Sequence, residues 1–153
     1  MAWSSGAVGV VPRFRRVASE SFELGDRDYR KLLLLRTDLR RFLRKSESFA
    51  RGAGLTPTQH QLLLAIRGHD EKAGPTISDV ADYLMLRHHS AVELVDQAVS
   101  AGLVVRRQDD ADGRTQRIRL TAKGTRLLRR LSLAAQDEWR RLAELLQPVL
   151  TPV

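Results

Sequence analysis

The chain has 153 residues, enough for one domain with a sizeable core, and its apolar residues (42%) are aliphatic rather than aromatic (5%), which argues against an all-β fold. It contains no cysteine, which excludes a disulfide framework, a thiol redox sensor and a thiolate zinc site. The 26 Lys and Arg against 18 Asp and Glu give a net charge of +8, which favours a polyanionic partner but does not distinguish DNA, RNA and an anionic membrane.

The N-terminal segment, residues 1–26, mixes small residues with a short basic cluster and shows no sustained period. We expect a flexible arm; an arm that lies across a partner subunit or adds phosphate contacts is the alternative. Apolar residues at helical spacing then predict a long amphipathic helix from Tyr29 to Phe49. Gly52 and Gly54 should end it.

The next helix has a recognisable start. Thr56 can act as N-cap, with Pro57 at the first helical position and Gln59 three residues after the cap. The helix should run to about Gly68, and residues 69–75 are expected to form a polar loop.

Two short helices separated by a few residues come next. Thr76 and Asp79 form a capping-box pattern that opens the first helix, and the segment Arg87-His88-His89-Ser90 opens the second. Gly102 should end the second helix, with Leu103 placed for the accompanying hydrophobic contact. A strand beginning at Val104 follows, and this order of elements predicts a winged helix-turn-helix.

The segment from Asp112 to Gly124 joins a turn, a strand and a helix start. Asp112 and Gly113 supply turn chemistry, and Thr121 fits an N-cap. Between them, two apolar residues alternate with Arg117 and Arg119, so we expect the basic side chains to face solvent together.

Such a hairpin by itself is typical of an ordinary solvated surface. After a helix-turn-helix it is better interpreted as a DNA-binding wing, with Arg114 near its tip able to enter a minor groove.

The C-terminal segment, from Ala122 to Leu150, carries apolar residues at spacings of three and four, with a bend expected near Gln136. This apolar stripe is wider than a small winged domain covers. Together with the helix over residues 27–50 it predicts a dimer interface, and a monomeric bundle is the alternative.

From about Tyr29 to Leu150 the chain resembles the MarR (multiple antibiotic resistance regulator) transcription factors. The resemblance is carried by Leu94-Val95-Asp96, Gly102-Leu103-Val104, Asp112-Gly113-Arg114 and Ile118-Arg119-Leu120-Thr121-Ala122-Lys123-Gly124. It implies a mainly α fold with a small β wing over residues 27–153. In it a winged helix-turn-helix lobe (55–121) sits on a helical dimerisation stalk (27–50 and 122–150). The implied partners are a pseudo-palindromic operator in double-stranded DNA, a second copy of the chain, and a small aromatic or anionic effector held between lobe and stalk.

The resemblance also assigns roles to residues. Arg114 is expected to enter the minor groove, and Asp112 to hold the wing geometry. Five further contacts are expected on the outward face of the second helix of the helix-turn-helix, which is the recognition helix of the family. Family members often begin this helix with a Ser-Pro-Ser-Thr type sequence, whereas this chain has Arg-His-His-Ser. The bases that this chain reads therefore cannot be inferred from the family. Glu93 also departs from the basic or polar residues frequent at its position, and it would be tolerated if it accepts from a cytosine amine or pairs with an arginine. The full expected DNA-binding set is Thr76, Ser78, Arg87, His88, His89, Ser90, Glu93, Arg107, Asp112, Arg114 and Arg117.

Other functional classes fit less well. The sequence has no nucleophile elbow, glycine-rich phosphate loop or metal-spaced cluster, so we expect neither an enzyme nor a cofactor or metal site. A winged helix that binds RNA or docks a protein remains the rival, although few aromatics are available for base stacking. No apolar run approaches the ~20 residues of a membrane span, and no secretion signal is recognised, so we expect a cytoplasmic protein.

Overall fold

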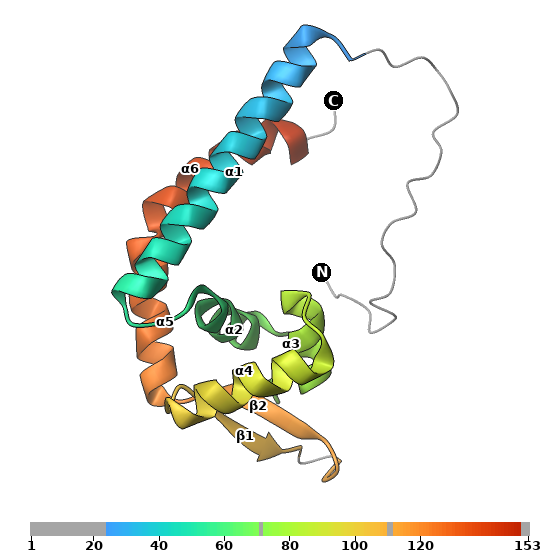
Figure 1. Ribbon diagram of the computed structural model, residues 1–153, viewed down its shortest axis with the longest axis vertical. Helices are drawn as coiled ribbons and strands as arrows, with labels where there is room; N and C mark the ends of the chain where they lie inside the picture. The colour runs from blue at the N-terminus through green and yellow to red at the C-terminus, as the bar shows by residue number, and fades with distance from the viewer. Residues whose placement is uncertain (1–23, 71, 110–111, 151–153) are drawn as a thin grey trace, which may run out of the picture.

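A computed structural model describes residues 24–70, 72–109 and 112–150, so all but the end of the expected N-terminal arm lies outside the described residues. Within these ranges the chain forms a helical stalk and a lobe that ends in a two-stranded wing (Figure 1). In chain order the elements are α1 (Asp26–Gly52), α2 (Pro57–Gly68), α3 (Ile77–Leu84), α4 (His88–Ser100), β1 (Val104–Gln108), β2 (Gln116–Leu120), α5 (Ala122–Ala134) and α6 (Gln136–Leu150). The predicted mainly α fold with a small β wing is confirmed.

The stalk consists of α1, α5 and α6, and α1 and α6 lie side by side (Figure 1). Their contact includes an edge-to-face pair of Phe42 and Trp139, with ring centroids 4.8 Å apart. Lys45 also donates a hydrogen bond to the Glu138 carboxylate, and this bond holds the pKa of Glu138 below its ordinary value. The expected bend is present, because Ala135 interrupts the helical path between α5 and α6.

Threonine side chains begin three of the helices, as predicted. Thr56 accepts a hydrogen bond from the Gln59 amide at the start of α2, and Thr76 accepts one from the Asp79 amide at the start of α3. Thr121 does the same for α5. Each cap satisfies a backbone donor that a helix start otherwise leaves without a partner.

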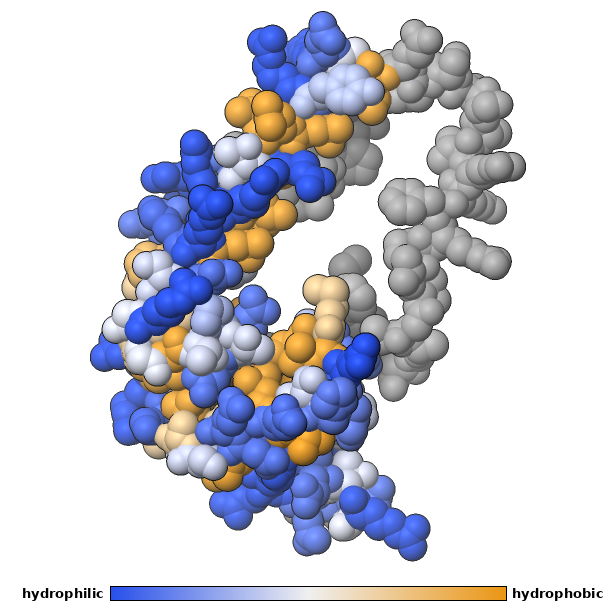
Figure 2. Space-filling model, in the orientation of Figure 1, coloured by the Kyte–Doolittle hydropathy of each residue, from blue (hydrophilic) through white to orange (hydrophobic). Residues whose placement is uncertain are grey.

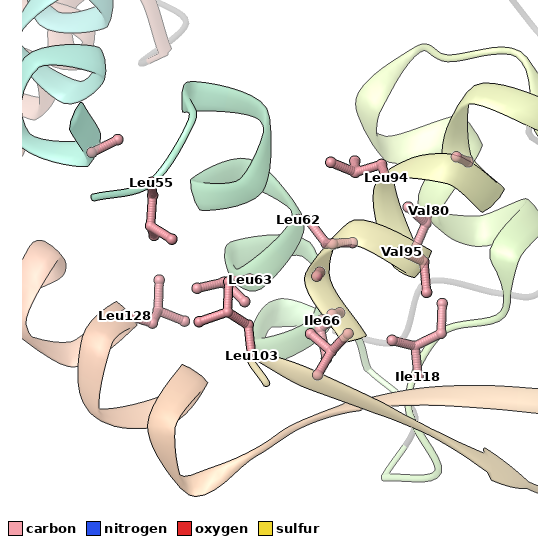
Figure 3. Packing of buried hydrophobic residues seen from close by; sticks show 14 of the residues in the cluster. Leu55, Leu62, Leu63, Ile66, Val80, Leu94, Val95, Leu103, Ile118 and Leu128 are labelled. Carbon is pink, nitrogen blue, oxygen red and sulfur yellow. The ribbon is translucent and has the colours of Figure 1, made fainter. Parts of the chain in front are cut away.

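The core of the lobe lies around α2 (Figure 3). Leu62 and Leu63 of α2 are fully buried, as are Val95 of α4 and Ile118 of β2. Val80 of α3 belongs to the same cluster, so one aliphatic core joins both helices of the helix-turn-helix, α3 and α4, to the wing.

The end of α4 follows the predicted glycine cap. Gly102 has a φ of +68°, and the Leu103 amide donates to the Ala98 carbonyl at 2.9 Å, as in a Schellman motif. Lys123 of α5 then donates to the Ala101 carbonyl at 2.8 Å, which places a cation at the negative end of α4. The C-terminal end of α4 is therefore held by the start of α5.

The wing is an antiparallel pair in which Val104 lies opposite Leu120 and Gln108 opposite Gln116. The loop before α3 packs against the edge of β2 that does not face β1, since the Ile118 amide donates to the Pro75 carbonyl at 2.9 Å. Gly74 permits this approach: its φ is +91°, and a Cβ there would lie 2.3 Å from the Ile118 carbonyl oxygen.

Candidate nucleic-acid interface

The first half of the candidate interface is the start of α4. Arg87 is the N-cap residue, and no side chain caps the first amides of this helix, in contrast to α2, α3 and α5. Arg87, His88 and His89 are exposed, and Ser90 is half-buried. Free amides at the positive end of a helix dipole, next to an arginine, suit a phosphate oxygen.

Glu93 lies one turn further along the exposed side of α4. Among the described residues it forms no ion pair, so the possibility that an arginine of this chain neutralises it is not realised in the structure. Its carboxylate is free to accept a hydrogen bond from a base amine. Asp96, also exposed on α4, instead pairs with Arg106 of β1 at 2.5 Å.

The second half is the turn of the wing. The Asp112 carboxylate accepts from the Arg114 amide at 3.1 Å and from the Thr115 hydroxyl at 2.9 Å. These bonds are what a residue that holds the wing geometry should make. Arg114 is exposed at this turn, and its side chain forms no hydrogen bond or ion pair with another described residue. Its guanidinium is therefore available to a ligand outside the chain.

The expectation that the basic side chains of β2 face solvent together is wrong for Arg117. Its side chain is only 18% exposed and pairs with Asp109 at 2.5 Å, and it also donates to the Gly74 carbonyl at 3.1 Å. Arg119 is exposed, although its Nε donates to the Ala73 carbonyl. Arg117 pairs with Asp109 rather than facing solvent because a half-buried guanidinium loses its contacts with water. A carboxylate and carbonyl oxygens must then accept its hydrogen bonds.

The three other expected contacts differ in availability. Ser78 of α3 and Arg107 of β1 are exposed. Thr76 is half-buried, and its hydroxyl is occupied by Asp79, to which it donates at 2.8 Å and from whose amide it accepts. The hydroxyl of Thr76, a residue expected to contact DNA, is thus engaged as the cap of α3.

Asp109 is a site residue that the sequence analysis missed. It lies one residue beyond β1, and besides holding Arg117 it accepts from the Asp112 amide at 3.3 Å, while its own amide donates to the Thr115 carbonyl. The hairpin register pairs Arg107 with Arg117, so Asp109, two residues beyond Arg107, lies diagonally across the strands from Arg117. The sequence alone does not fix that register, because several turn lengths fit between the two strands.

A cavity of about 380 Å³ lies where the lobe meets the stalk. Phe42 and Trp139 of the stalk line it, together with Tyr83 of α3 and polar side chains that include His60 and Gln61. Burial lowers the pKa of His60, so that its imidazole is neutral near pH 7. The resemblance implied an effector between lobe and stalk, but the sequence identified none of the residues that line this cavity.

The described residues contain neither a metal-binding cluster nor a candidate membrane span. Across residues 24–70, 72–109 and 112–150, no three His, Asp or Glu side chains are grouped so as to hold a metal ion. No helix in the same ranges is both long and apolar enough to cross a membrane.

Comparison with protein families gives one match that overlaps the candidate interface. The model of the MarR family matches residues 53–115, the part of the chain that holds the helix-turn-helix and the first strand of the wing. No curated protein matches the sequence significantly.

Solved structures share the fold at low sequence identity. A point mutant of Staphylococcus aureus MepR bound to an oligodeoxyribonucleotide superposes with a TM-score of 0.60 at 20% identity, covering 74% of this chain and 81% of that one. Apo wild-type MarR from E. coli gives 0.62 at 21% identity, with 77% and 95% covered. AbsC, a MarR family transcriptional regulator from Streptomyces coelicolor, gives 0.63 at 20% identity, with 85% of each chain covered.

Proposed function

We propose that the chain, whose residues 53–115 match the model of the MarR family, is a sequence-specific regulator of transcription that binds double-stranded DNA. The observation that carries the proposal is the pairing, in one lobe, of an uncapped cationic helix start at Arg87 with an exposed arginine at the wing turn, Arg114. The first element suits the major groove and its phosphates, and the second suits the minor groove. The DNA-bound MepR mutant supports the same partner. With DNA as its partner, the protein would work in the cytoplasm.

Replacing the wing arginine tests this proposal. The test needs a DNA duplex selected from genomic fragments that the unmodified protein binds. We expect Arg114→Ala to weaken binding to this duplex by about 1 to 3 kcal/mol, roughly 5- to 150-fold, because no guanidinium then reaches the groove. The fold should not change, since the Arg114 side chain is exposed and holds no other described residue. Fluorescence anisotropy with a labelled duplex measures the affinity, and circular dichroism checks the fold.

Arg140→Ala is the matched control for charge, because Arg140 is exposed on the stalk and pairs with neighbouring Asp137. It should bind the duplex as the unmodified protein does. Equal affinity of the Arg114 variant would remove the wing from the interface. Preference for single-stranded RNA over the duplex would favour the rival RNA-binding function instead.

We further propose that the active form is a homodimer that represses by occupying a pseudo-palindromic operator. Several apolar side chains of the stalk are exposed in the single chain, and Figure 2 shows apolar surface interleaved with charged side chains along this part. Leu33 is 62% exposed and Tyr29 59%, which is costly for helices without a partner. A second copy would bury this surface and supply the second reading helix. A monomeric mass in sedimentation equilibrium at micromolar concentration would contradict this part of the proposal.

The junction cavity is the proposed effector site, and its lining refines the expected chemistry. No Lys, Arg, Asp or Glu is among the described residues that line it, and His60 is neutral near pH 7. Aromatic rings and a few hydrogen-bonding groups instead favour a neutral aromatic compound over an anion. Because the cavity lies between lobe and stalk, an occupant there would change how the lobes are held relative to each other.

A neutral phenol should therefore quench the fluorescence of Trp139 and release the duplex, whereas benzoate should do neither through this cavity. Trp139→Phe keeps the apolar lining and removes the reporter, and it serves as the optical control. If benzoate quenches Trp139 more effectively than phenol does, the assignment of a neutral effector is wrong.

A further inference from the structure

A second cavity, of about 350 Å³, lies at the base of the wing. It is formed by the C-terminal end of α2, the loop before α3, strand β2 and the start of α5. Buried Ile66 and Ile118 contribute to an apolar floor. The volume is within the range of small-molecule sites, which begins at roughly 300 Å³.

The rim of this cavity is cationic. Arg67, Lys72 and Arg119 line it, and no Asp or Glu is among its described lining residues. Asp70 is exposed in the same loop but does not line the cavity. Three like charges around one opening repel each other, and an anion between them would relieve that repulsion.

Two of the lining residues, Arg119 and His69, offer hydrogen-bonding groups that no described residue uses. The Nε of Arg119 donates to the Ala73 carbonyl at 3.1 Å, which fixes the guanidinium beside the cavity and leaves its remaining donors without a described partner. His69 donates or accepts at Tyr83 through Nδ1, at 2.9 Å. Its Nε2 is buried and has no hydrogen-bond partner among the described residues. An unpaired buried ring nitrogen is costly, and in the tautomer whose Nδ1 accepts from the Tyr83 hydroxyl, Nε2 carries the proton and could donate it to an anion.

The cavity differs from the junction cavity in its chemistry. The junction cavity has aromatic walls and no charged lining residue among those described, whereas this one combines an aliphatic floor with three cations. The two sites should therefore select different molecules. We propose that the wing-base cavity binds a small organic anion, in which a carboxylate or phosphate group meets Arg67, Lys72 and Arg119 and a compact apolar body covers Ile66 and Ile118.

Binding at this position would act on the wing. The loop before α3 and strand β2 both contribute walls, and they are already joined through the Ile118 amide and the Pro75 carbonyl. An anion that bridges Lys72 of the loop and Arg119 of the strand adds a second connection. Occupancy is therefore expected to make the base of the wing more rigid.

The test uses the full-length protein with benzoate and phenyl phosphate as probes and benzyl alcohol as the neutral analogue. Amide chemical shifts report the site, because Gly74 lines the cavity and Trp139 lines the other one. We expect at least one of the two anions to shift Gly74 saturably, and the alcohol to leave it unchanged. The better anion shows which acidic group the cavity selects.

The variant Arg67→Gln/Lys72→Gln removes two rim cations from exposed positions, and Arg129→Gln/Arg130→Gln removes two exposed cations from α5 that do not line the cavity. The first should weaken anion binding about tenfold or more, and the second should leave it unchanged. Equal weakening in both would show attraction by net charge alone and overturn the proposal. Absence of a saturable shift at Gly74, or an anion response confined to Trp139, would also overturn it.

A duplex-binding measurement separates this inference from the proposed function. If Arg67→Gln/Lys72→Gln loses as much duplex affinity as Arg114→Ala, the rim cations contact DNA phosphates and the anion site is wrong. If the protein binds no duplex but anions still shift Gly74 in the unmodified chain, the inference stands without the proposed function.

Discussion

Binding to duplex DNA is expected to weaken by about a thousandfold or more when the salt concentration rises from 50 to 200 mM. Two lobes, each with a wing arginine and a cationic helix start, would neutralise about six to ten phosphates and release their counterions. The net charge of +8 per chain adds long-range attraction to the same effect. Anisotropy titrations at four or five salt concentrations give the slope of log K against log salt.

The slope also reports on individual phosphate interactions. A variant that no longer neutralises one phosphate should have a slope that is shallower by about one unit for each phosphate affected. Arg87→Gln is the appropriate variant, because Arg87 is exposed at the uncapped start of α4. Arg140→Ala on the stalk should leave the slope unchanged. Affinity that does not depend on salt would show that phosphate neutralisation does not drive binding.

Gly124→Ala is expected to destabilise the fold by about 2 kcal/mol or more, even though alanine favours a helix over glycine by about 1 kcal/mol. Gly124 lies in the first turn of α5, where a Cβ would be 2.2 Å from the Leu103 carbonyl oxygen. That oxygen is part of the backbone and accepts hydrogen bonds from Thr121, so it cannot move without disturbing the joint between α4, the wing and α5. Chemical denaturation at fixed protein concentration measures the loss.

Gly52→Ala is the matched control for this substitution. Gly52 is also helical, at the end of α1, but nothing lies within 4 Å of a Cβ built there. The change should be neutral or slightly stabilising. If both variants have the same free energy of unfolding as the original protein, the close approach of Gly124 to Leu103 is not a constraint on the fold.

Local chemistry made most of the lobe predictable. The caps at Thr56 and Thr76 each use a partner three residues later in the sequence. The glycine at Gly102, in the left-handed region, likewise acts on its neighbours. Such features can be predicted without knowledge of the fold. The same holds for the turn held by Asp112, whose partners are two and three residues away. The exposure of Arg87, His88 and His89 also follows from the helical period of their apolar neighbours.

The charges on the wing were less predictable. Alternation in β2 placed Arg117 and Arg119 on one face, but alternation does not say whether that face meets water or another segment. The loop before α3 covers part of it, so Arg117 pairs with Asp109 and donates to Gly74.

By itself the sequence determined the order of the helices and strands and the caps of most helices, because these depend on interactions within a few residues, although α1 begins at Asp26, three residues before the predicted start. Tertiary structure decided the partners of Arg117, the close approach at Gly124 and the two cavities, whose walls come from helices and strands far apart in the chain. The physical reason is range. Caps, turns and helical periods act between neighbours, whereas the shape and charge of a cavity depend on how separate elements pack against one another.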